Sequence, residues 1–197
     1  MNIDTLPPSA LPPSNLKSLR FTTSRLLLRE FVEEDWRAVQ TYQSDPLYTR
    51  YHAWEQPTEA EARAFVGRFV AQQHEEPRTK FQFAIVLPRE GLLIGTCGLR
   101  INDTTVREGN IGYELDSRFW GKGYATEVAH EMLRLGFEEH NLHRIWAGCV
   151  SENVGSARVL EKIGMRREAH FREKEFFKGR WWDELLYAIL DHEWKAP

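Results

Sequence analysis

The sequence predicts an α/β domain (α+β mixed sheet): a central, mostly antiparallel sheet that contains one parallel pair and carries helices on both faces. Strand and helix patterns follow one another in the order βααβββαβαββ. A strand–helix–strand unit over 106–150 implies one parallel pair with a right-handed crossover, and the short turns before it imply antiparallel neighbours. With 197 residues, 42% of them apolar, the chain is long enough for one domain with its own core.

The first elements are a strand and a helix. Residues 26–31 (LLLREF) form an apolar run of strand length. A helix is expected over 33–44 with Trp36, Val39 and Tyr42 inward, because these residues recur at helical spacing. The pair Asp45-Pro46 follows and is expected to end this helix, since a residue before proline disfavours helical geometry.

A second helix is predicted over 58–74, followed by three strands. Thr58 and Glu61 have capping-box spacing, and the apolar residues behind them recur at i, i+3, i+4 and i+7. The three strands are expected at 80–87, 92–101 and 106–116, with turns at 88–91 and 102–103.

The second half begins with a glycine-rich turn and alternates helices with strands. Gly164 is expected to stop the second of its helices, and Lys178-Gly179 to join the last two strands. The elements predicted are a turn at 121–123, a helix at 124–139, a strand at 143–150, a helix at 153–163, and strands at 166–177 and 181–190.

Residues 1–20 differ in composition from the rest. LPPS occurs twice there, and proline blocks regular hydrogen bonding, so we expect a flexible tail before a single domain over 21–197. It lacks the charged and apolar regions of a secretion signal. A partner-docking role for the tail, which would make the chain an interaction protein, stays open.

Composition narrows the function classes. A net charge of −3 argues against a non-specific nucleic-acid binder, which needs a large basic surface. No apolar run approaches the ~18 residues of a membrane span. Cys97 and Cys149 match no metal spacing, the histidines form no metal constellation, and two thiols make a weak disulfide framework, so a cytoplasmic location without a metal is expected.

The segment 115–126 carries the main chemical signal, an anion site at a helix start. Gly121 and Gly123 permit positive φ, and the free N–H groups of 121–126 together with the helix dipole favour phosphate or pyrophosphate. Arg118 and Lys122 would add positive charge. The plain alternative is an ordinary strand-to-helix turn, and neither a P-loop nor a dinucleotide fingerprint is present.

These residues resemble a known family. Arg118-x-x-Gly121-x-Gly123 matches the [Q/R]-x-x-G-x-[G/A] acetyl-CoA signature of GCN5-related N-acetyltransferases (GNAT). The segments IGYELD, WGKGYATE, NVGSARVLEKIGM and KGRWWDE are similar to the RimJ/RimL-like subgroup, which acetylates the N-termini of ribosomal proteins. The resemblance covers roughly residues 22–194 with the same order of elements.

The resemblance implies an acetyl-CoA-dependent acyltransferase whose strands 106–116 and 143–150 splay apart around the pantetheine arm. Ser156 would lie beside the thioester. Arg158 and Lys162 would face either phosphate or solvent, and solvent is favoured for Lys162. The residues expected to bind acetyl-CoA are Leu115, Arg118, Phe119, Trp120, Gly121, Lys122, Gly123, Tyr124, Ala125, Thr126, Asn153 and Arg158.

Two departures from the family pattern affect the catalytic assignment. Many relatives have Glu where this chain has Asn110. Many also have a Tyr that acts as the general acid where this chain has Leu160. Relatives without that Tyr use a Ser at the position of Ser156, which is present here. Strand alternation places Glu114 on the same face as Asn110. Partial desolvation on that face would raise the pKa of Glu114, so that it could act as the general base. The alternative for Glu114 is a structural salt bridge.

The acceptor amine is expected on the side opposite CoA, between the loop 46–57 and the last hairpin. Aromatic side chains suit the stem of an amine or a peptide N-terminus. The residues predicted to bind the acceptor are Tyr51, Trp54, Trp181 and Asp183, while Trp36, Trp146 and Trp182 are assigned to the core. The acceptor is either a protein N-terminal α-amine or a small-molecule amine.

Asn110 and Leu160 also favour a competing function, a non-catalytic acyl-CoA-binding module of the same fold. A homodimer through the last hairpin is common among relatives, and exposed Trp or Phe would suit it. No nucleic acid or membrane partner is expected.

Overall fold

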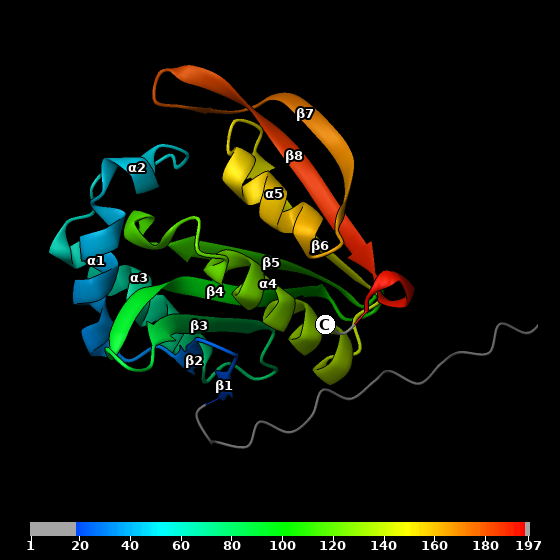
Figure 1. The fold of residues 1–197 in the computed structure, drawn as a ribbon, viewed down its shortest axis with the longest axis horizontal. Helices are drawn as coiled ribbons and strands as arrows, with labels where there is room; N and C mark the ends of the chain where they lie inside the picture. Colours follow the sequence, from blue (N-terminus) through cyan, green and yellow to red (C-terminus); the bar gives the residue numbers. More distant parts are fainter. Residues whose placement is uncertain (1–18, 196–197) are drawn as a thin grey trace, which may run out of the picture.

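The structure is a computed structural model that describes residues 19–195. Its centre is an eight-stranded sheet in the order β1-β2-β3-β4-β5-β6-β8-β7 (Figure 1). The strands are β1 (Arg20–Thr22), β2 (Leu27–Glu30), β3 (Lys80–Leu87), β4 (Leu92–Asp103), β5 (Glu108–Leu115), β6 (Arg144–Val150), β7 (Arg166–Phe177) and β8 (Arg180–Leu190). The mixed α/β fold predicted from the sequence is confirmed.

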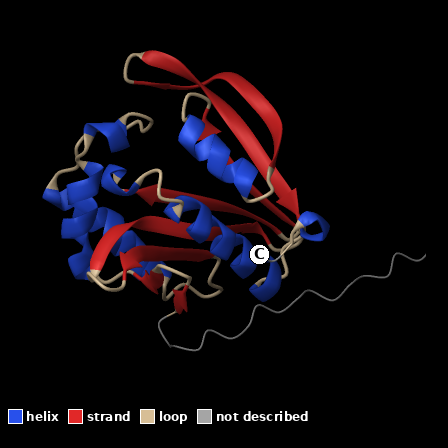
Figure 2. Ribbon diagram, in the orientation of Figure 1, coloured by secondary structure: helices blue, strands red, loops and turns tan. Residues whose placement is uncertain are grey.

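Helices cover both faces of this sheet (Figure 2). The α-helices are α1 (Trp36–Gln43), α2 (Pro46–Thr49), α3 (Glu59–Gln72), α4 (Tyr124–Arg134) and α5 (Val154–Lys162). Short turns of other helix types are η1 (Glu33–Asp35), η2 (Ser117–Phe119), the π-helix η3 (Leu135–Glu139) and η4 (Asp191–Glu193). The predicted capping box is present at α3, where Thr58 and Glu61 bond reciprocally.

The pairing of β5 with β6 is the one parallel contact among the described strands, and it is short. Only Glu108, Gly109 and Asn110 pair with β6, opposite residues 144–146. Beyond this point β5 stays paired with β4 up to Leu115, and β6 stays paired with β8 up to Val150. The two strands therefore diverge over their C-terminal halves, as the predicted splay requires.

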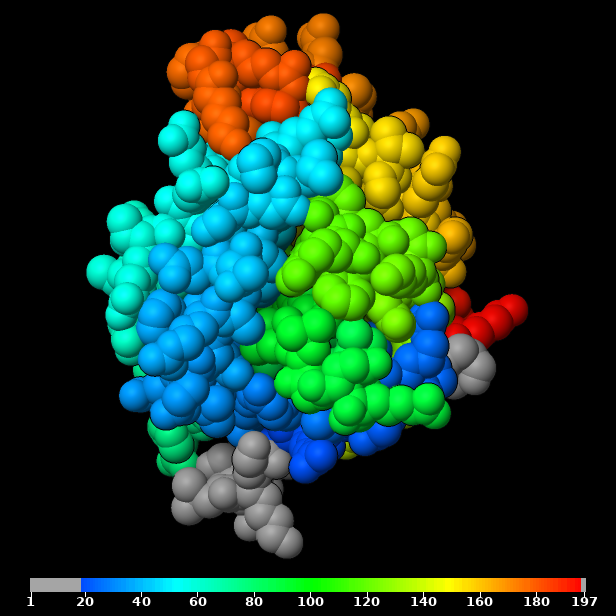
Figure 3. All heavy atoms as spheres, turned by 60° about the vertical axis from the view of Figure 1, so that its left-hand side comes forward, coloured from blue at the N-terminus to red at the C-terminus, as the bar shows by residue number. Residues whose placement is uncertain are grey.

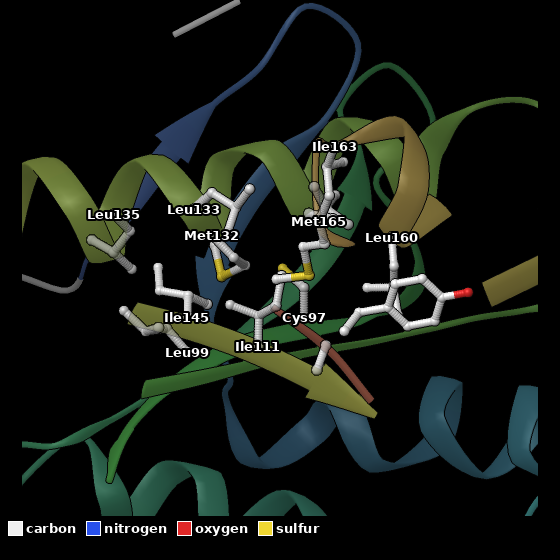
Figure 4. Packing of buried hydrophobic residues seen from close by; sticks show 14 of the residues in the cluster. Cys97, Leu99, Ile111, Met132, Leu133, Leu135, Ile145, Leu160, Ile163 and Met165 are labelled. Carbon is white, nitrogen blue, oxygen red and sulfur yellow. The ribbon is translucent and has the colours of Figure 1, made fainter. Parts of the chain in front are cut away.

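Two cores lie on the two faces of the sheet. The larger packs α4 and α5 against the strands, with Met132, Leu133 and Ile145 fully buried (Figure 4). The smaller packs α1 and α3 against β3 and β4, and Trp36, Val39 and Tyr42 are buried in it as expected. Only the larger core includes buried residues of β5 and β6, the two strands of the splay.

Several elements depart from the sequence predictions for local reasons. The segment after Asp45 was expected to be a loop, but it begins with the short helix α2. The Asp45 side chain caps this helix by accepting a hydrogen bond from Leu47 N, and Pro46 is its first residue. The predicted turn at 102–103 is wrong, because β4 runs through Asp103 and the Asp103 carboxylate caps the turn by accepting from Thr105 N and Val106 N. The helix from residue 124 becomes a π-helix at Leu135.

The N-terminal boundary also moves. Residues 1–18 of the predicted proline-rich tail lie outside the described residues. Arg20 begins β1, and the backbone N–H of Leu19 donates to Glu30 Oε2 (3.1 Å). The last two residues of the predicted tail therefore belong to the domain.

Candidate active site

The glycine turn adopts the left-handed backbone that its sequence predicts. Gly121 has φ +73° and Gly123 has φ +81°. Gly123 is the N-cap residue of α4, and the first intrahelical bond there joins Glu127 N to Gly123 O (3.1 Å). The N–H groups of the first helical turn consequently have no carbonyl partner within the helix and, with the helix dipole, favour an anion at this end.

Arg25, which the sequence did not single out, braces this turn from the N-terminal side. Its Nη1 donates to the carbonyl of Lys122 (2.8 Å), its guanidinium forms an ion pair with Glu127 (2.7 Å), and it lies over the ring of Tyr124. Glu127 also accepts from the backbone N–H of Arg25 (2.9 Å). Burial opposes ionisation of Glu127, but these hydrogen bonds leave its pKa below the usual value.

The two basic residues predicted to strengthen the anion site lie elsewhere. Arg118 forms a salt bridge with the buried Asp116 (2.5 Å), so its charge is paired within the turn. Burial alone would raise the pKa of Asp116, but hydrogen bonds from Arg118 hold it below its usual value. Lys122 lies over the Phe119 ring. Neither cation lines the cavity described next, so backbone amides rather than these side chains define the site.

A cavity of about 1040 Å³ lies between the splayed strands and extends from the glycine turn to the last hairpin. Trp146 lines it and is only partly buried, contrary to the assignment of this residue to the core. Lys162 also borders it and is exposed, which agrees with the solvent-facing position favoured for this residue. The predicted site residues along its walls are Tyr51, Glu114, Leu115, Phe119, Trp120, Gly121, Gly123, Tyr124, Ala125, Thr126, Asn153, Ser156, Arg158 and Asp183.

Glu114 lies in the wall of this cavity with a desolvated carboxylate. Burial raises the pKa of Glu114 above its ordinary value, and the polar groups of Tyr48, Gln43 and Arg100 only partly oppose the shift. Its Oε2 atom is buried and has no hydrogen-bond partner among the described residues. Glu114 forms no salt bridge with a cation of residues 19–195, and Arg100 acts on it from beyond ion-pair distance, so the structural salt bridge considered for Glu114 is absent.

Ser156 lies on the opposite wall and has a partner that sequence reasoning missed. The Tyr113 hydroxyl hydrogen-bonds to Ser156 Oγ (3.0 Å) and donates to the Ser156 carbonyl (3.1 Å). Asn153 caps α5 by accepting from Ser156 N (3.1 Å). Strand alternation alone places Tyr113 and Glu114 on opposite faces of β5, but the contact with α5 depends on tertiary packing.

The acceptor side differs from the prediction in its tryptophans. Trp182 is buried and lines the cavity, with its ring edge-on to Tyr51, whereas Trp181 is 55% exposed and does not line it. Trp54 lies outside this cavity and stacks on His52 beside a second, smaller one. The tip of the β7–β8 hairpin reaches α2, where Lys178 Nζ donates to the Thr49 carbonyl (2.7 Å; Figure 3).

The carboxylates on this side are largely paired with cations of the hairpin. Asp183 contacts His170 Nε2 (2.6 Å) and accepts from Glu173 N, and Glu184 forms an ion pair with Lys174 (2.7 Å). Hydrogen bonds from Glu173 N and His170 hold the pKa of Asp183 low. These pairings join β7 to β8 within the hairpin.

Residues 19–195 contain no group of three or more His, Cys, Asp or Glu side chains that could hold a metal ion. No helix in the same range is long and apolar enough to cross a membrane. Both cysteines, Cys97 and Cys149, are free thiols.

Comparison with known proteins assigns the chain to one enzyme class. The model of the acetyltransferase (GNAT) domain family matches residues 25–166. A solved GNAT-family acetyltransferase from Bacillus anthracis is 36% identical, covers 89% of this chain and all of its own, and superposes with a TM-score of 0.77. The chain belongs to the GNAT family of N-acetyltransferases.

Curated relatives agree. The uncharacterized N-acetyltransferase YnaD of Bacillus subtilis (strain 168) is 40% identical over 178 residues, which are 89% of this chain and 99% of the relative. The [ribosomal protein uS5]-alanine N-acetyltransferase of Escherichia coli (strain K12) is 25% identical over 92% of this chain and 95% of its own. The sequence resemblance to GNAT enzymes is thus confirmed.

The backbone of the glycine turn yields a stability prediction. A Cβ at Gly121 would meet nothing within 4 Å, so Gly121→Ala introduces left-handed strain without a clash and should lower the free energy of unfolding by about 1–2 kcal/mol. Gly121→Asn should cost less, because Asn tolerates this conformation. Urea denaturation of the three proteins provides the measurement.

Gly67, in the middle of α3, is the matched control. A Cβ there also meets nothing within 4 Å, but its backbone is helical, so Gly67→Ala should stabilise the protein by about 0.5–1 kcal/mol. Equal destabilisation by Gly121→Ala and Gly67→Ala would show that the left-handed conformation is not what constrains residue 121.

Proposed function

We propose that this protein transfers the acetyl group of acetyl-CoA to a primary amine, by direct attack of the amine within a ternary complex. One observation carries the proposal. A single cavity brings together the glycine turn, the desolvated carboxylate of Glu114 and the hydroxyl of Ser156. The acceptor is a protein N-terminal α-amine or a small-molecule amine, and the relative named for uS5-alanine acetylation supports the first of these.

The described residues fit acetyl-CoA. Beyond Asn110 the backbone of β5 has no partner on β6, so its N–H and C=O groups face the cavity side and suit an extended amide-containing arm. Leu115 and Asn153 line the two walls, the amides of 121–126 suit a pyrophosphate, and Arg158 adds positive charge. Bound acetyl-CoA supplies a thioester, whose C–S bond breaks as the C–N bond to the amine forms.

Glu114 is the proposed base. A peptide α-amine has a pKa of ~7.7–8.0 and a lysine amine ~10.4, so either must lose a proton before it attacks. A carboxylate with a raised pKa is a better proton acceptor than an exposed one, and the unpartnered Oε2 of Glu114 is available to receive the proton directly or through water. The neighbouring Asn110 has no carboxylate for this role.

Ser156 is the proposed proton donor to the departing thiolate. Leu160, at the position where many relatives have Tyr, is buried in the core and leaves no phenol on α5. Tyr113 supplies one from β5 instead: its hydroxyl contacts Ser156 Oγ, so a proton that leaves Ser156 can be replaced from the adjacent phenol. Burial raises the pKa of Tyr113, which keeps the phenol protonated at neutral pH.

The location and assembly proposed are those expected from the sequence. We place the reaction in the cytoplasm, where the Cys97 and Cys149 thiols remain reduced. Phe176 and Trp181 are 60% and 55% exposed and pack edge-to-face near the tip of the hairpin, which supports association of two copies there.

Acetyl-CoA binding and turnover test the proposal together. Acetyl-CoA at 100 times its dissociation constant should stabilise the fold by about 2.7 kcal/mol, measured as a thermal shift, and an amine panel should release free thiol. No shift would refute acetyl-CoA binding. A shift without thiol release from peptides, polyamines, aminoglycosides or amino acids would favour the non-catalytic acyl-CoA module.

Glu114→Gln should lower kcat at least about ten-fold while acetyl-CoA affinity is unchanged, because the amide cannot accept a proton. Since only the ionised carboxylate acts as base, the wild-type rate should rise with pH through the raised pKa of Glu114. That inflection should vanish in the variant. Wild-type turnover in Glu114→Gln, or an unchanged pH profile, would exclude Glu114 as the base.

Ser156→Ala should reduce kcat by about ten-fold or more without unfolding the protein, since the departing thiolate loses its donor. Tyr113→Phe should reduce kcat less, because Ser156 keeps its own proton. Single-turnover kinetics with a matched melting curve separates the two effects. Wild-type kinetics in Ser156→Ala would remove this residue from the mechanism.

A further inference from the structure

A second cavity of about 420 Å³ lies on the α1–α3 face of the sheet and shares part of its wall with the first. His52, Arg100, Gly112, Tyr113 and Glu114 line both cavities, so the proposed base stands at their junction. The remaining walls of the second cavity are Trp54, Phe65, Arg68, Phe69, Gln72, Gln82, Thr96 and Cys97. Several of these come from α3, which the sequence assigned no functional role.

Two glycines open this hollow in the sheet. Gln82, Gly98 and Gly112 lie opposite one another across β3, β4 and β5. A Cβ at Gly98 would clash with the side-chain amide of Gln82, and a Cβ at Gly112 would lie 3.4 Å from Arg100 Nη1. The absence of side chains at 98 and 112 therefore leaves room for the polar ends of Gln82 and Arg100 above the sheet.

Arg100 brings a positive charge into this hollow without an acidic partner. Its guanidinium donates to Asn110 Oδ1 (3.3 Å) and faces the amide of Gln82, and no carboxylate of the described residues lies within ion-pair distance of it. Burial lowers the pKa of Arg100, although Glu114 acts in the opposite direction. A half-buried guanidinium without an ion pair carries a desolvation cost that a bound anion would offset.

Other groups around the cavity also lack partners. Thr96 Oγ1 and Gln72 Oε1 are buried without a hydrogen bond to any described residue, as is Glu114 Oε2. Arg68, at the exposed rim on α3, has a cation–π contact with Phe65 and forms no ion pair within residues 19–195. Unpartnered acceptor atoms together with two guanidinium groups without an ion pair in the described part of the chain favour a polar ligand that carries both hydrogen-bond donors and an anionic group.

The charged residues around the two cavities favour a ligand that brings an anionic group to Arg100 over one that carries a second ammonium group. At the other end of the first cavity, Asp183 contacts His170 and Glu184 forms an ion pair with Lys174. His52, which stacks between Tyr48 and Trp54, has a pKa lowered to about 4 by burial and by Lys178, so it is neutral at pH 7. Arg100 and Arg68 are the two guanidinium groups that line the second cavity, and Glu114 is the carboxyl group that lines it.

We propose that the second cavity is the acceptor pocket and that the acceptor is a free amino acid, whose carboxylate binds Arg100 while its amine reaches Glu114. This inference rests on the proposed acetyl transfer and specifies its substrate class. The N-terminal residue of a polypeptide fits less well, because its carboxylate is replaced by an amide that leaves Arg100 without an anion. The aromatic walls from Phe65, Phe69 and Trp54 would contact the amino-acid side chain.

Wild-type protein provides the first test, in which the twenty amino acids are compared with their α-carboxamides and with short peptides. At least one amino acid should show a kcat/KM about ten-fold or more above that of its own amide. This preference runs against intrinsic reactivity, since loss of the carboxylate makes the amine easier to deprotonate. Amides or peptides that react as well as the acids would overturn the proposal.

Arg100→Gln provides the second test. It should raise KM for the preferred amino acid at least about ten-fold and leave KM for the corresponding amide within about two-fold. Arg63→Gln, on an exposed i,i+4 pair of α3 that lines neither cavity, removes the same charge and should change neither value. Equal effects of Arg100→Gln on acid and amide would mean that Arg100 only positions Glu114, and would refute carboxylate binding.

Calorimetry separates this inference from the proposed function. In the presence of CoA, the preferred amino acid should bind the wild-type protein and its amide should bind at least about ten-fold more weakly. Binding of the amino acid without acetyl transfer would refute the enzymatic proposal and keep the pocket assignment. Thiol release with peptides or other amines, without amino-acid binding, would refute the pocket assignment and keep the enzyme.

Discussion

The limited pairing between β5 and β6 is the constraint on which the rest of the site depends. Three residues of β5 pair with β6, and each strand then stays paired with its outer neighbour. Backbone groups at an open strand edge require partners, from water or a ligand. The larger core, under α4 and α5, includes buried residues of both strands, whereas the smaller core under α1 and α3 lies on β3 and β4.

Two desolvated charged side chains lie on the sheet near the separation of β5 from β6. Glu114 and Arg100 lie on the same face of adjacent strands, both desolvated and beyond ion-pair distance from each other. If Glu114 and Arg100 formed a close ion pair, both groups would be held ionised. Because they are separated, the pKa of the Glu114 carboxyl is raised and the Arg100 guanidinium has no ion-pair partner among the described residues. Gly98 and Gly112 keep the space between these groups open. The face of the sheet that packs α1 and α3 therefore carries two desolvated charged side chains.

The glycine turn, on the side of the site where acetyl-CoA is proposed to bind, could largely be predicted from local sequence. Gly121 and Gly123 take left-handed conformations that other residues disfavour, and a helix start follows them directly, so the anion site follows from a few adjacent residues. The side-chain contacts that support this turn could not be predicted in the same way. Arg25 reaches the turn from about a hundred residues away, and Arg118 turns back to Asp116 instead of facing the cavity.

The acceptor side shows why alternation within a strand is an incomplete guide. Period 2 states that Trp181 and Trp182 point to opposite faces of β8, but it does not state which face meets the cavity. The shifts of register between β7 and β8 and the contact of Lys178 with α2 decide that Trp182 faces inward. The second cavity was not predicted at all, since its walls combine residues of α3 with three strands.

The sequence by itself determined the order of elements apart from β1 and α2, the capping box of α3, the glycine turn and the membership of an acetyl-transferring family. Each of these depends on residues close together in the chain or on a contiguous motif. Only the tertiary structure decided how far β5 and β6 separate, which hydroxyl lies beside Ser156 and where Arg100 stands unpaired. These features depend on strand register and on desolvation. Both arise from contacts between segments far apart in the chain, which a local pattern does not encode.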